Sequence, residues 1–123
     1  MAIYQSGEDY LEAILTLQQK RGQVRSVDVA QELGYSKPSV SIAMKKLREQ
    51  GYVIVDENGL LSLTEQGRQV ACGVYERHTT IKRVLMLIGV EEAEAAEEAC
   101  KLEHAISDKT LEKLKAYIER AEA

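Results

Sequence analysis

The stretch 26–50 constrains the fold most strongly, because it holds two short helices separated by a turn glycine. Apolar residues at helical spacing predict a helix over 26–33, with Ser26 as its N-cap and Gly34 as its stop. Ser36 can cap the next helix, which runs to about residue 50 and has Pro38 in its first turn, where a missing N–H costs nothing. Two helices joined by such a short turn predict a helix-turn-helix.

A β-hairpin is predicted directly after these helices. The β-prone runs 52–55 and 60–63 flank Asp56-Glu57-Asn58-Gly59, and Asn-Gly between such runs is a hairpin signal. Together with a first helix over 7–20, the pattern is that of a winged helix-turn-helix with the small hairpin as its wing.

The remainder of the chain is predicted to be helical. Thr64 can cap a long helix that reaches about residue 88, and further helices are expected over 91–106 and 109–121. The fold class is therefore mostly α, with a winged helix-turn-helix domain over 1–63 and a helical domain over 64–123. Apolar positions of the helical domain are candidates for core or subunit interface: Ala93, Ala96, Leu102, Leu111, Leu114 and Ile118.

Composition indicates a small soluble globular protein of 123 residues, with 45% hydrophobic and 29% charged residues. The longest uncharged apolar run, 84–90, is too short to span a bilayer, and residues 1–5 lack the plan of a signal peptide, so we expect a cytoplasmic protein. In a reducing compartment Cys72 and Cys100 are expected to be free thiols or a metal ligand rather than a disulfide.

Charge is distributed unevenly along the chain, whose net charge is −4. Residues 37–48 include four basic residues and no acidic one, whereas residues 91–104 include six glutamates and one lysine. The first stretch can meet phosphate and the second can meet a cation.

The second helix of a helix-turn-helix enters the major groove, which makes its exposed face the predicted DNA-reading element. Short hydroxyls allow close approach, lysines contact phosphate, and the apolar Ile42 lies beside them. The predicted DNA-binding residues are Ser36, Lys37, Pro38, Ser39, Ser41, Lys45 and Lys46. The simpler alternative is that the lysines only solvate a helix face, and the acidic residues of the hairpin turn argue against phosphate contacts by the wing.

A second group of residues has the chemistry of a metal site. Cys100, Glu103 and His104 are expected to project from neighbouring parts of one helix face, and a thiolate, a carboxylate and an imidazole together suit a first-row divalent ion. His78 on the preceding helix can join the same ion or a second one. Asp9 and Glu12 lie three residues apart on the first helix, where two carboxylates can point in one direction.

Each of these residues also has an ordinary structural explanation. Asp9 can complete a variant capping box with Ser6, Glu12 can be a solvated surface residue, and a single histidine such as His78 is more often structural. Cys100 alone would be a small core residue, as we expect Cys72 to be. The prediction of a metal site therefore depends on the whole set.

At this point the sequence resembles the iron- and manganese-dependent repressors typified by the diphtheria toxin repressor and the manganese transport regulator. The resemblance covers essentially the whole chain. It is carried by Glu8-Asp9-Tyr10-Leu11-Glu12, Ser36-Lys37-Pro38-Ser39-Val40-Ser41, Leu63-Thr64-Glu65-Gln66-Gly67, Tyr75-Glu76-Arg77-His78 and Cys100-Lys101-Leu102-Glu103-His104.

The resemblance implies that Asp9, Glu12, His78, Glu103 and His104 are metal ligands of the manganese-regulator kind. Cys100 stands where manganese-type members have a carboxylate and iron-type members a cysteine, so the implied site is a hybrid. Lys82 and Ala96 fall where the iron-type ancillary site has ligands, and such a site is not expected here. The chain also ends without the SH3-like domain of longer members, which makes it resemble the short form.

The resulting expectation is a metal-dependent repressor that senses Fe²⁺ or Mn²⁺, with Co²⁺ and Zn²⁺ as surrogates, and controls metal-homeostasis genes. It would bind a palindromic operator in double-stranded DNA as a homodimer formed by the helical domain. The alternative is a metal-independent winged-helix regulator that senses redox state or a small molecule through its cysteines. An enzyme is not expected, because no His-Glu-x-x-His, Ser-His-Asp or phosphate-loop pattern is visible.

Overall fold

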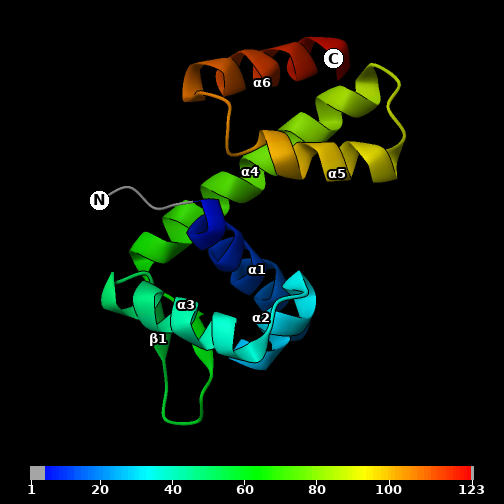
Figure 1. Cartoon of the computed structure of the whole chain (residues 1–123). Coiled ribbons are helices and arrows are strands. Elements are labelled where there is room, and N and C mark those ends of the chain that lie inside the picture. Colours follow the sequence, from blue (N-terminus) through cyan, green and yellow to red (C-terminus); the bar gives the residue numbers. More distant parts are fainter. Residues whose placement is uncertain (1–4, 123) are drawn as a thin grey trace. The chain divides into compact units, whose positions relative to one another are not determined.

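The computed structural model describes residues 5–122, apart from the side chain of residue 5, and within that range contains six helices and one β-hairpin (Figure 1). The chain divides into two compact units, Met1–Cys72 and Gly73–Ala123. The predicted mostly α architecture, a winged helix-turn-helix followed by helices, is confirmed. The assignment of separate roles to residues 1–63 and 64–123 stays a prediction.

The first unit begins with three helices, α1 (Gln5–Arg21), α2 (Ser26–Leu33) and α3 (Lys37–Glu49). Gly34 ends α2 in the left-handed region, at φ 71°, a conformation that glycine adopts without steric cost. The Ser36 hydroxyl accepts a hydrogen bond from the backbone N–H of Ser39 at 3.3 Å, which confirms it as the N-cap of α3. The turn between α2 and α3 is therefore built as the sequence predicts.

The start of α2 differs from the prediction that Ser26 caps it. Arg25 occupies the N-cap position, and its backbone N–H donates to the carboxylate of Asp28 at 2.9 Å. The same carboxylate pairs with Arg21 at 3.2 Å. The acidic side chain thus stabilises the helix start from inside the first turn, where negative charge also suits the helix dipole.

The wing consists of β1 (Val53–Val55) and β2 (Leu61–Leu63), which pair antiparallel with Ile54 opposite Ser62. In the turn, the Asp56 carboxylate accepts hydrogen bonds from the backbone N–H groups of Asn58 and Leu60 at 2.8 and 2.9 Å. Gly59 has φ 79°, as its place after Asn58 in the hairpin requires. The wing is anchored to the loop before α2 by a backbone hydrogen bond from Leu61 to Val24 at 2.7 Å.

The core of the first unit joins α1, α2, α3 and the hairpin. Leu11, Ile14 and Leu17 of α1 are almost completely buried, because they recur at helical spacing on one side of that helix. They pack in one cluster with apolar residues of the other elements: Val24, Val29, Val40, Met44, Leu47, Tyr52, Val53, Leu61 and Ala71.

The long helix α4 (Glu65–Leu87) begins as predicted at Thr64, whose hydroxyl accepts from the Gly67 N–H at 3.0 Å and donates to the Gly51 carbonyl at 2.6 Å. A Cβ added at Gly67 would lie 2.0 Å from the carbonyl oxygen of Tyr52, so only glycine fits where α4 passes the hairpin. The boundary between the two units falls within α4.

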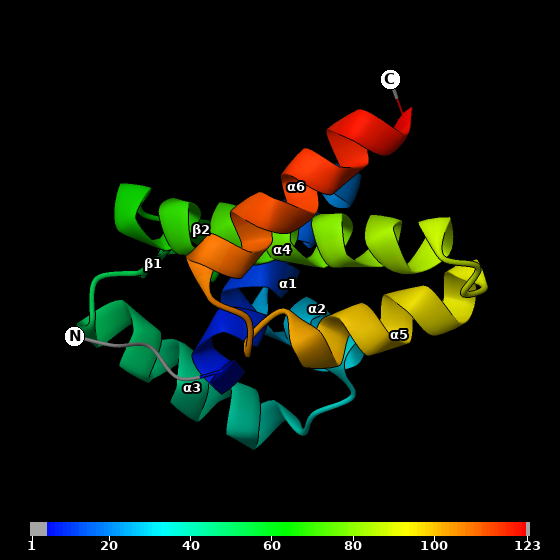
Figure 2. The same ribbon diagram turned by 90° about the horizontal axis from the view of Figure 1, so that it is seen from above.

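The second unit contains the later part of α4 with α5 (Glu92–Leu102) and α6 (Asp108–Glu122). Its buried apolar residues are Val74, Ile81, Ala95, Ala99 and Leu111. A short loop, residues 103–107, joins α5 to α6 and is visible in Figure 2 where gold changes to orange. The Ser107 hydroxyl accepts from the Thr110 N–H at 3.1 Å and so caps α6. None of the described helices is long and apolar enough to cross a lipid bilayer.

Candidate metal centre and nucleic-acid interface

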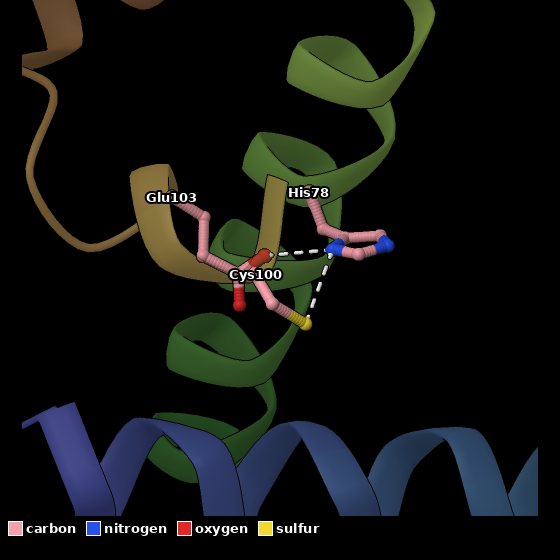
Figure 3. A group of neighbouring side chains, drawn as sticks. All are labelled: His78, Cys100 and Glu103. Carbon is pink, nitrogen blue, oxygen red and sulfur yellow. Dashed lines mark hydrogen bonds and ion pairs between the residues drawn. The ribbon is translucent and has the colours of Figure 1, made fainter. Parts of the chain in front are cut away.

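A histidine, a cysteine and a glutamate converge in the second unit (Figure 3). His78 projects from α4, Cys100 lies in the last turns of α5, and Glu103 is the C-cap residue of α5. The Nδ1 atom of His78 lies 2.9 Å from Oε2 of Glu103 and 3.9 Å from Sγ of Cys100. One nitrogen, one oxygen and one sulfur atom thus face each other across two helices.

His104 lies beside Glu103 of this cluster, in a different element than expected. The sequence predicted one helix over 91–106 that would carry Cys100, Glu103 and His104 on one face, but α5 ends at Leu102 and His104 lies in the turn that follows. The change of direction still leaves His104 Nε2 3.3 Å from Oε1 of Glu103, and the His104 side chain is only 7% exposed. Glu103 therefore has one imidazole near each carboxylate oxygen.

The donor atoms fit a first-row divalent cation. Metal–nitrogen and metal–oxygen bonds of about 2.1 Å and metal–sulfur bonds of about 2.3 Å place two donors of one ion roughly 3–4.4 Å apart. The donor atoms of His78, Cys100 and Glu103 all lie within 4.8 Å of one another, so small side-chain rotations bring them into that range. The group also contains both the hard oxygen and the soft sulfur ligands that transition ions accept.

The burial of Glu103 supports the same conclusion. Its side chain is 1% exposed, and among residues 5–122 no lysine or arginine side chain pairs with its carboxylate. Burying a carboxylate is costly unless positive charge or hydrogen bonds compensate it, and in the described part of the chain its only ion-pair partners are the two imidazoles, with Oε1 making no hydrogen bond. A cation held among these donors would supply the compensating charge.

Arg77, next to His78 on α4, is a residue of this region that the sequence did not single out as functional. Its guanidinium reaches the loop that carries Glu103 and His104. The partners lie 26 and 29 residues away along the chain, so neither periodicity nor a local motif could reveal the contact. The only sign of Arg77 in the sequence was its position directly before His78, a candidate ligand.

Of the two cysteines, Cys72 differs from the expectation. Both are exposed free thiols. Cys72, predicted to be a core residue, faces away from the packed side of α4, because the buried residues of that turn are Ala71 and Val74. Cys100 lies beside His78, where its thiol can act as a ligand.

Asp9 and Glu12 belong to the first unit. They lie three residues apart on α1 and are both partly buried. Tyr10 between them packs edge-on against Tyr35, with ring centroids 5.8 Å apart. Burial raises the pKa of the Tyr10 phenol, and the neighbouring Tyr35 and Asp9 add to the rise. The membership of Asp9 and Glu12 in the metal site stays a prediction.

The predicted DNA-reading helix α3 presents a polar, basic outer face. Its lysines Lys37, Lys45 and Lys46 are exposed, and within the described part of the chain none of them pairs with a carboxylate. Ser36 and Ser39 share a hydroxyl–hydroxyl hydrogen bond of 2.8 Å at the start of the helix, where Pro38 and Ser41 are also exposed. Ile42 stands on this face with 65% of its side chain exposed.

A hollow of about 200 Å³ beside α3 extends the basic surface. It is lined by Ser26, Ser41, Met44, Lys45, Arg48 and Val55. The hydroxyls of Ser26 and Ser41 and the cationic groups of Lys45 and Arg48 are the donors that proteins direct at DNA phosphates. The wing turn exposes the acidic Asp56 and Glu57, whereas α3 exposes lysines. The surface that can attract phosphate is therefore on α3 and not on the wing turn.

The sequence matches two family profiles that divide at the wing. Residues 3–60 match the Iron dependent repressor, N-terminal DNA binding domain, and residues 64–123 match the Iron dependent repressor, metal binding and dimerisation domain. This chain belongs to the iron-dependent repressor family. The chain thus matches both the DNA-binding domain and the metal binding and dimerisation domain of that family.

Among curated iron-dependent repressor relatives, an HTH-type transcriptional regulator of Methanocaldococcus jannaschii is 40% identical over 94% of this chain and 94% of its own length. The transcriptional regulator MntR of Escherichia coli is 32% identical over 92% of this chain and 73% of its own length. Both are described as transcriptional regulators.

A solved structure of a manganese-dependent transcriptional repressor in complex with manganese has the same fold. It is 33% identical, with a TM-score of 0.84 over 92% of this chain. The chain covers 52% of that protein and 55% of the manganese regulator SloR, so it spans about half the length of these solved structures.

Proposed function

We propose that this iron-dependent repressor family member is a metal-dependent DNA-binding repressor that senses Fe²⁺ or Mn²⁺ in the cytoplasm and controls metal-homeostasis genes. The observation that carries the proposal is the convergence of His78, Cys100 and the buried carboxylate of Glu103 in one unit. The alternative of a metal-independent thiol sensor leaves this carboxylate without a role. Two similar solved structures, of a manganese-dependent transcriptional repressor and of a manganese regulator, also favour metal as the effector.

The proposed metal ligands are His78, Cys100, Glu103 and His104, joined by Asp9 and Glu12 as the family resemblance implies. A bound divalent ion supplies positive charge and a fixed coordination geometry. Around it, the His78 and His104 imidazoles coordinate in their neutral forms and Cys100 as a thiolate, so binding weakens on acidification. The thiolate makes Fe²⁺, Co²⁺ and Zn²⁺ more competitive with Mn²⁺ than an all-oxygen and nitrogen site would.

On the DNA side, we propose that α3 enters the major groove with Ser36, Lys37, Pro38, Ser39, Ser41, Lys45 and Lys46 at the interface. The N–H groups at a helix start, to which Pro38 contributes none, and the hydroxyl of the cap suit phosphate, while residues further along the first turns reach base edges. A homodimer would place two such helices in successive major grooves, about 34 Å apart, on a palindromic operator. Metal would then act as a co-repressor by favouring that spacing.

The proposal is tested by measuring the binding of chelator-stripped protein to DNA from upstream of its own gene, under anaerobic conditions, with Mn²⁺, Fe²⁺ or Zn²⁺ added in turn. We expect DNA affinity to rise with at least one ion. Cys100→Ser and His104→Ala should remove most of that gain, whereas Cys72→Ser, which alters the other exposed thiol, should keep it. Equal DNA binding with and without every ion would refute metal sensing and revive thiol or small-molecule sensing.

A further inference from the structure

The guanidinium of Arg77 contacts both ends of the loop that separates α5 from α6. Its Nη1 donates to the carbonyl oxygen of Ile106 at 2.5 Å and to that of Glu103 at 3.3 Å. Its Nη2 pairs with the carboxylate of Asp108, the first residue of α6. The Arg77 side chain is 21% exposed and its two bonds to carbonyl oxygens are partly buried, so these two are screened less than the pair with the exposed Asp108.

From this arrangement we propose that Arg77 is a positioning residue for metal binding: it holds the segment that carries Glu103 and His104 in the conformation that binds the ion. The inference rests on the proposed metal site. Arg77 touches no candidate ligand atom, since its contact with Glu103 is to the main-chain carbonyl and not to the carboxylate. It therefore acts through the backbone of the loop.

The chemistry of the loop requires a donor of this kind. The last carbonyls of a helix have no partner within it, and they carry the negative end of the helix dipole. The backbone turns after Leu102, where the N–H groups of Ala105 and Ile106 both donate to the Leu102 carbonyl at 3.0 and 3.3 Å. The carbonyl of Glu103, the C-cap residue, accepts instead from Arg77, a cation that suits the end of a helix, and so does the carbonyl of Ile106 in the loop.

Arginine suits this role because its planar fork presents several N–H donors in fixed directions. One nitrogen serves the carbonyl of Glu103 at the end of α5 and that of Ile106 in the loop, and the other serves Asp108 at the start of α6. The three partners lie within six residues of one another, so the guanidinium connects the two ends of the loop. A lysine has one ammonium centre and cannot cover both sides in the same geometry.

The position of Arg77 on α4 connects the loop to another ligand. The next residue, His78, faces the Glu103 carboxylate at 2.9 Å, while Arg77 holds the Glu103 main chain. One turn of α4 thus fixes both the imidazole and the backbone that carries its partner. Partners that orient metal ligands typically account for about 10–100-fold in metal affinity, and we expect Arg77 to fall in that range.

The experiment titrates Co²⁺ into anaerobic, chelator-stripped full-length protein and follows the visible d–d bands and the thiolate-to-cobalt absorption. The variants are Arg77→Gln and Arg77→Lys. Arg83→Gln is the matched control, because Arg83 lies on the same helix and makes a doubly bonded ion pair with Glu122 of α6, away from the loop. Thermal unfolding of the metal-free proteins is measured in parallel.

Arg77→Gln should weaken Co²⁺ binding by about 10–100-fold and change the d–d bands, because the ligands no longer hold one arrangement. Arg77→Lys should recover part of the affinity but not the wild-type spectrum, and Arg83→Gln should match the wild type in both. A wild-type affinity and spectrum in Arg77→Gln would overturn the inference; if that variant does not fold, the same result in Arg77→Lys would do so. If the wild type binds Co²⁺ without thiolate absorption, the proposed metal site itself fails.

Discussion

At the scale of single residues, Glu103 combines near-complete burial with a negative charge. Its 1% exposed carboxylate is compensated only by the imidazoles of His78 and His104 in the described part of the chain. A buried charge often contributes less to stability than a neutral residue of the same shape. Such a residue is retained for what it binds, and its replacement should separate folding from metal binding.

Glu103→Gln keeps the shape of the side chain and removes the charge. We expect the metal-free protein to become more stable, by on the order of 1 kcal/mol, because a neutral amide costs less to bury than a carboxylate with an unbonded oxygen. The stabilisation by metal, about 2.7 kcal/mol when the ion is present at a hundred times its Kd, should disappear. Urea unfolding with and without Mn²⁺ measures both effects.

Glu98→Gln is the control for this experiment, because Glu98 lies on the same helix with a side chain 47% exposed and a surface pair to Lys101. It should leave the free energy of unfolding and the gain from metal nearly unchanged. A metal-free Glu103→Gln protein that is clearly less stable than the wild type would show that the carboxylate serves the fold rather than an ion.

At the scale of elements, the path of α4 beside the hairpin depends on one glycine. The Tyr52 carbonyl that would clash with a Cβ at Gly67 cannot easily move, because it accepts a hydrogen bond from the Thr64 N–H at 3.1 Å and belongs to a buried residue. Gly67→Ala should therefore lower the free energy of unfolding by about 1–3 kcal/mol. Chemical denaturation followed by circular dichroism checks the value.

Gly73→Ala provides the matched comparison on the same helix. A Cβ at Gly73 meets nothing within 4 Å, so the substitution should raise stability by up to about 1 kcal/mol through helix propensity alone. The two substitutions should thus change the free energy of unfolding in opposite directions. Similar changes in the free energy of unfolding for both substitutions would mean that the Tyr52 carbonyl does not lie in close contact with α4 at Gly67.

The outer face of α3 has its own prediction. Lys45→Gln and Lys46→Gln should each reduce the steepness with which DNA affinity falls with salt, by about one unit on a plot of log affinity against log salt, because each removes one phosphate contact. Lys113→Gln on α6 changes the net charge equally and should leave the slope unchanged. Fluorescence anisotropy over a salt series gives the slopes; equal slopes for all three variants would contradict a role for α3 at the phosphates.

The elements also show which parts of the fold are visible in the sequence. The capped start of α3, the Asn-Gly hairpin and the Thr64 cap of α4 were predicted correctly, because each depends on residues within a few positions of one another. The cap of α2 was misassigned, since a carboxylate three residues inside the helix binds the backbone of Arg25. The end of α5 was placed too late because the backbone turns after Leu102, and the carbonyls of Glu103 and Ile106 in the loop accept from Arg77, which is far away in sequence.

At the scale of the whole molecule, the same distinction applies to the site. Residue chemistry and spacing grouped Cys100 with Glu103 and His104 and suggested that His78 could join them, and the structure brings His78 from another helix close to the first two. The exposure of Cys72 and the role of Arg77 could not be predicted, because both depend on which side of α4 packs against its neighbours. Local patterns thus identify candidate ligands, while tertiary packing decides how their side chains are placed.

Repression by metal requires that the metal and DNA sites be coupled through the entire chain. Any factor by which metal raises DNA affinity must, by thermodynamic linkage, raise metal affinity in the presence of DNA equally. We expect a factor of about 5–150, which corresponds to roughly 1–3 kcal/mol. Calorimetric titration of Mn²⁺ into the protein, alone and in complex with operator DNA, measures one side of this cycle, and DNA titrations with and without Mn²⁺ measure the other.

Cys100→Ser removes a proposed ligand, and Arg77→Gln removes a residue that positions ligands. Both should weaken metal binding in the free and in the DNA-bound protein. DNA binding without metal should stay at the wild-type level, because neither residue lies on α3. A ligand shifts an equilibrium only by its different affinities for the two states. Equal Mn²⁺ affinity with and without DNA in the wild type would therefore exclude the metal as co-repressor, even if the ion binds tightly to His78, Cys100 and Glu103.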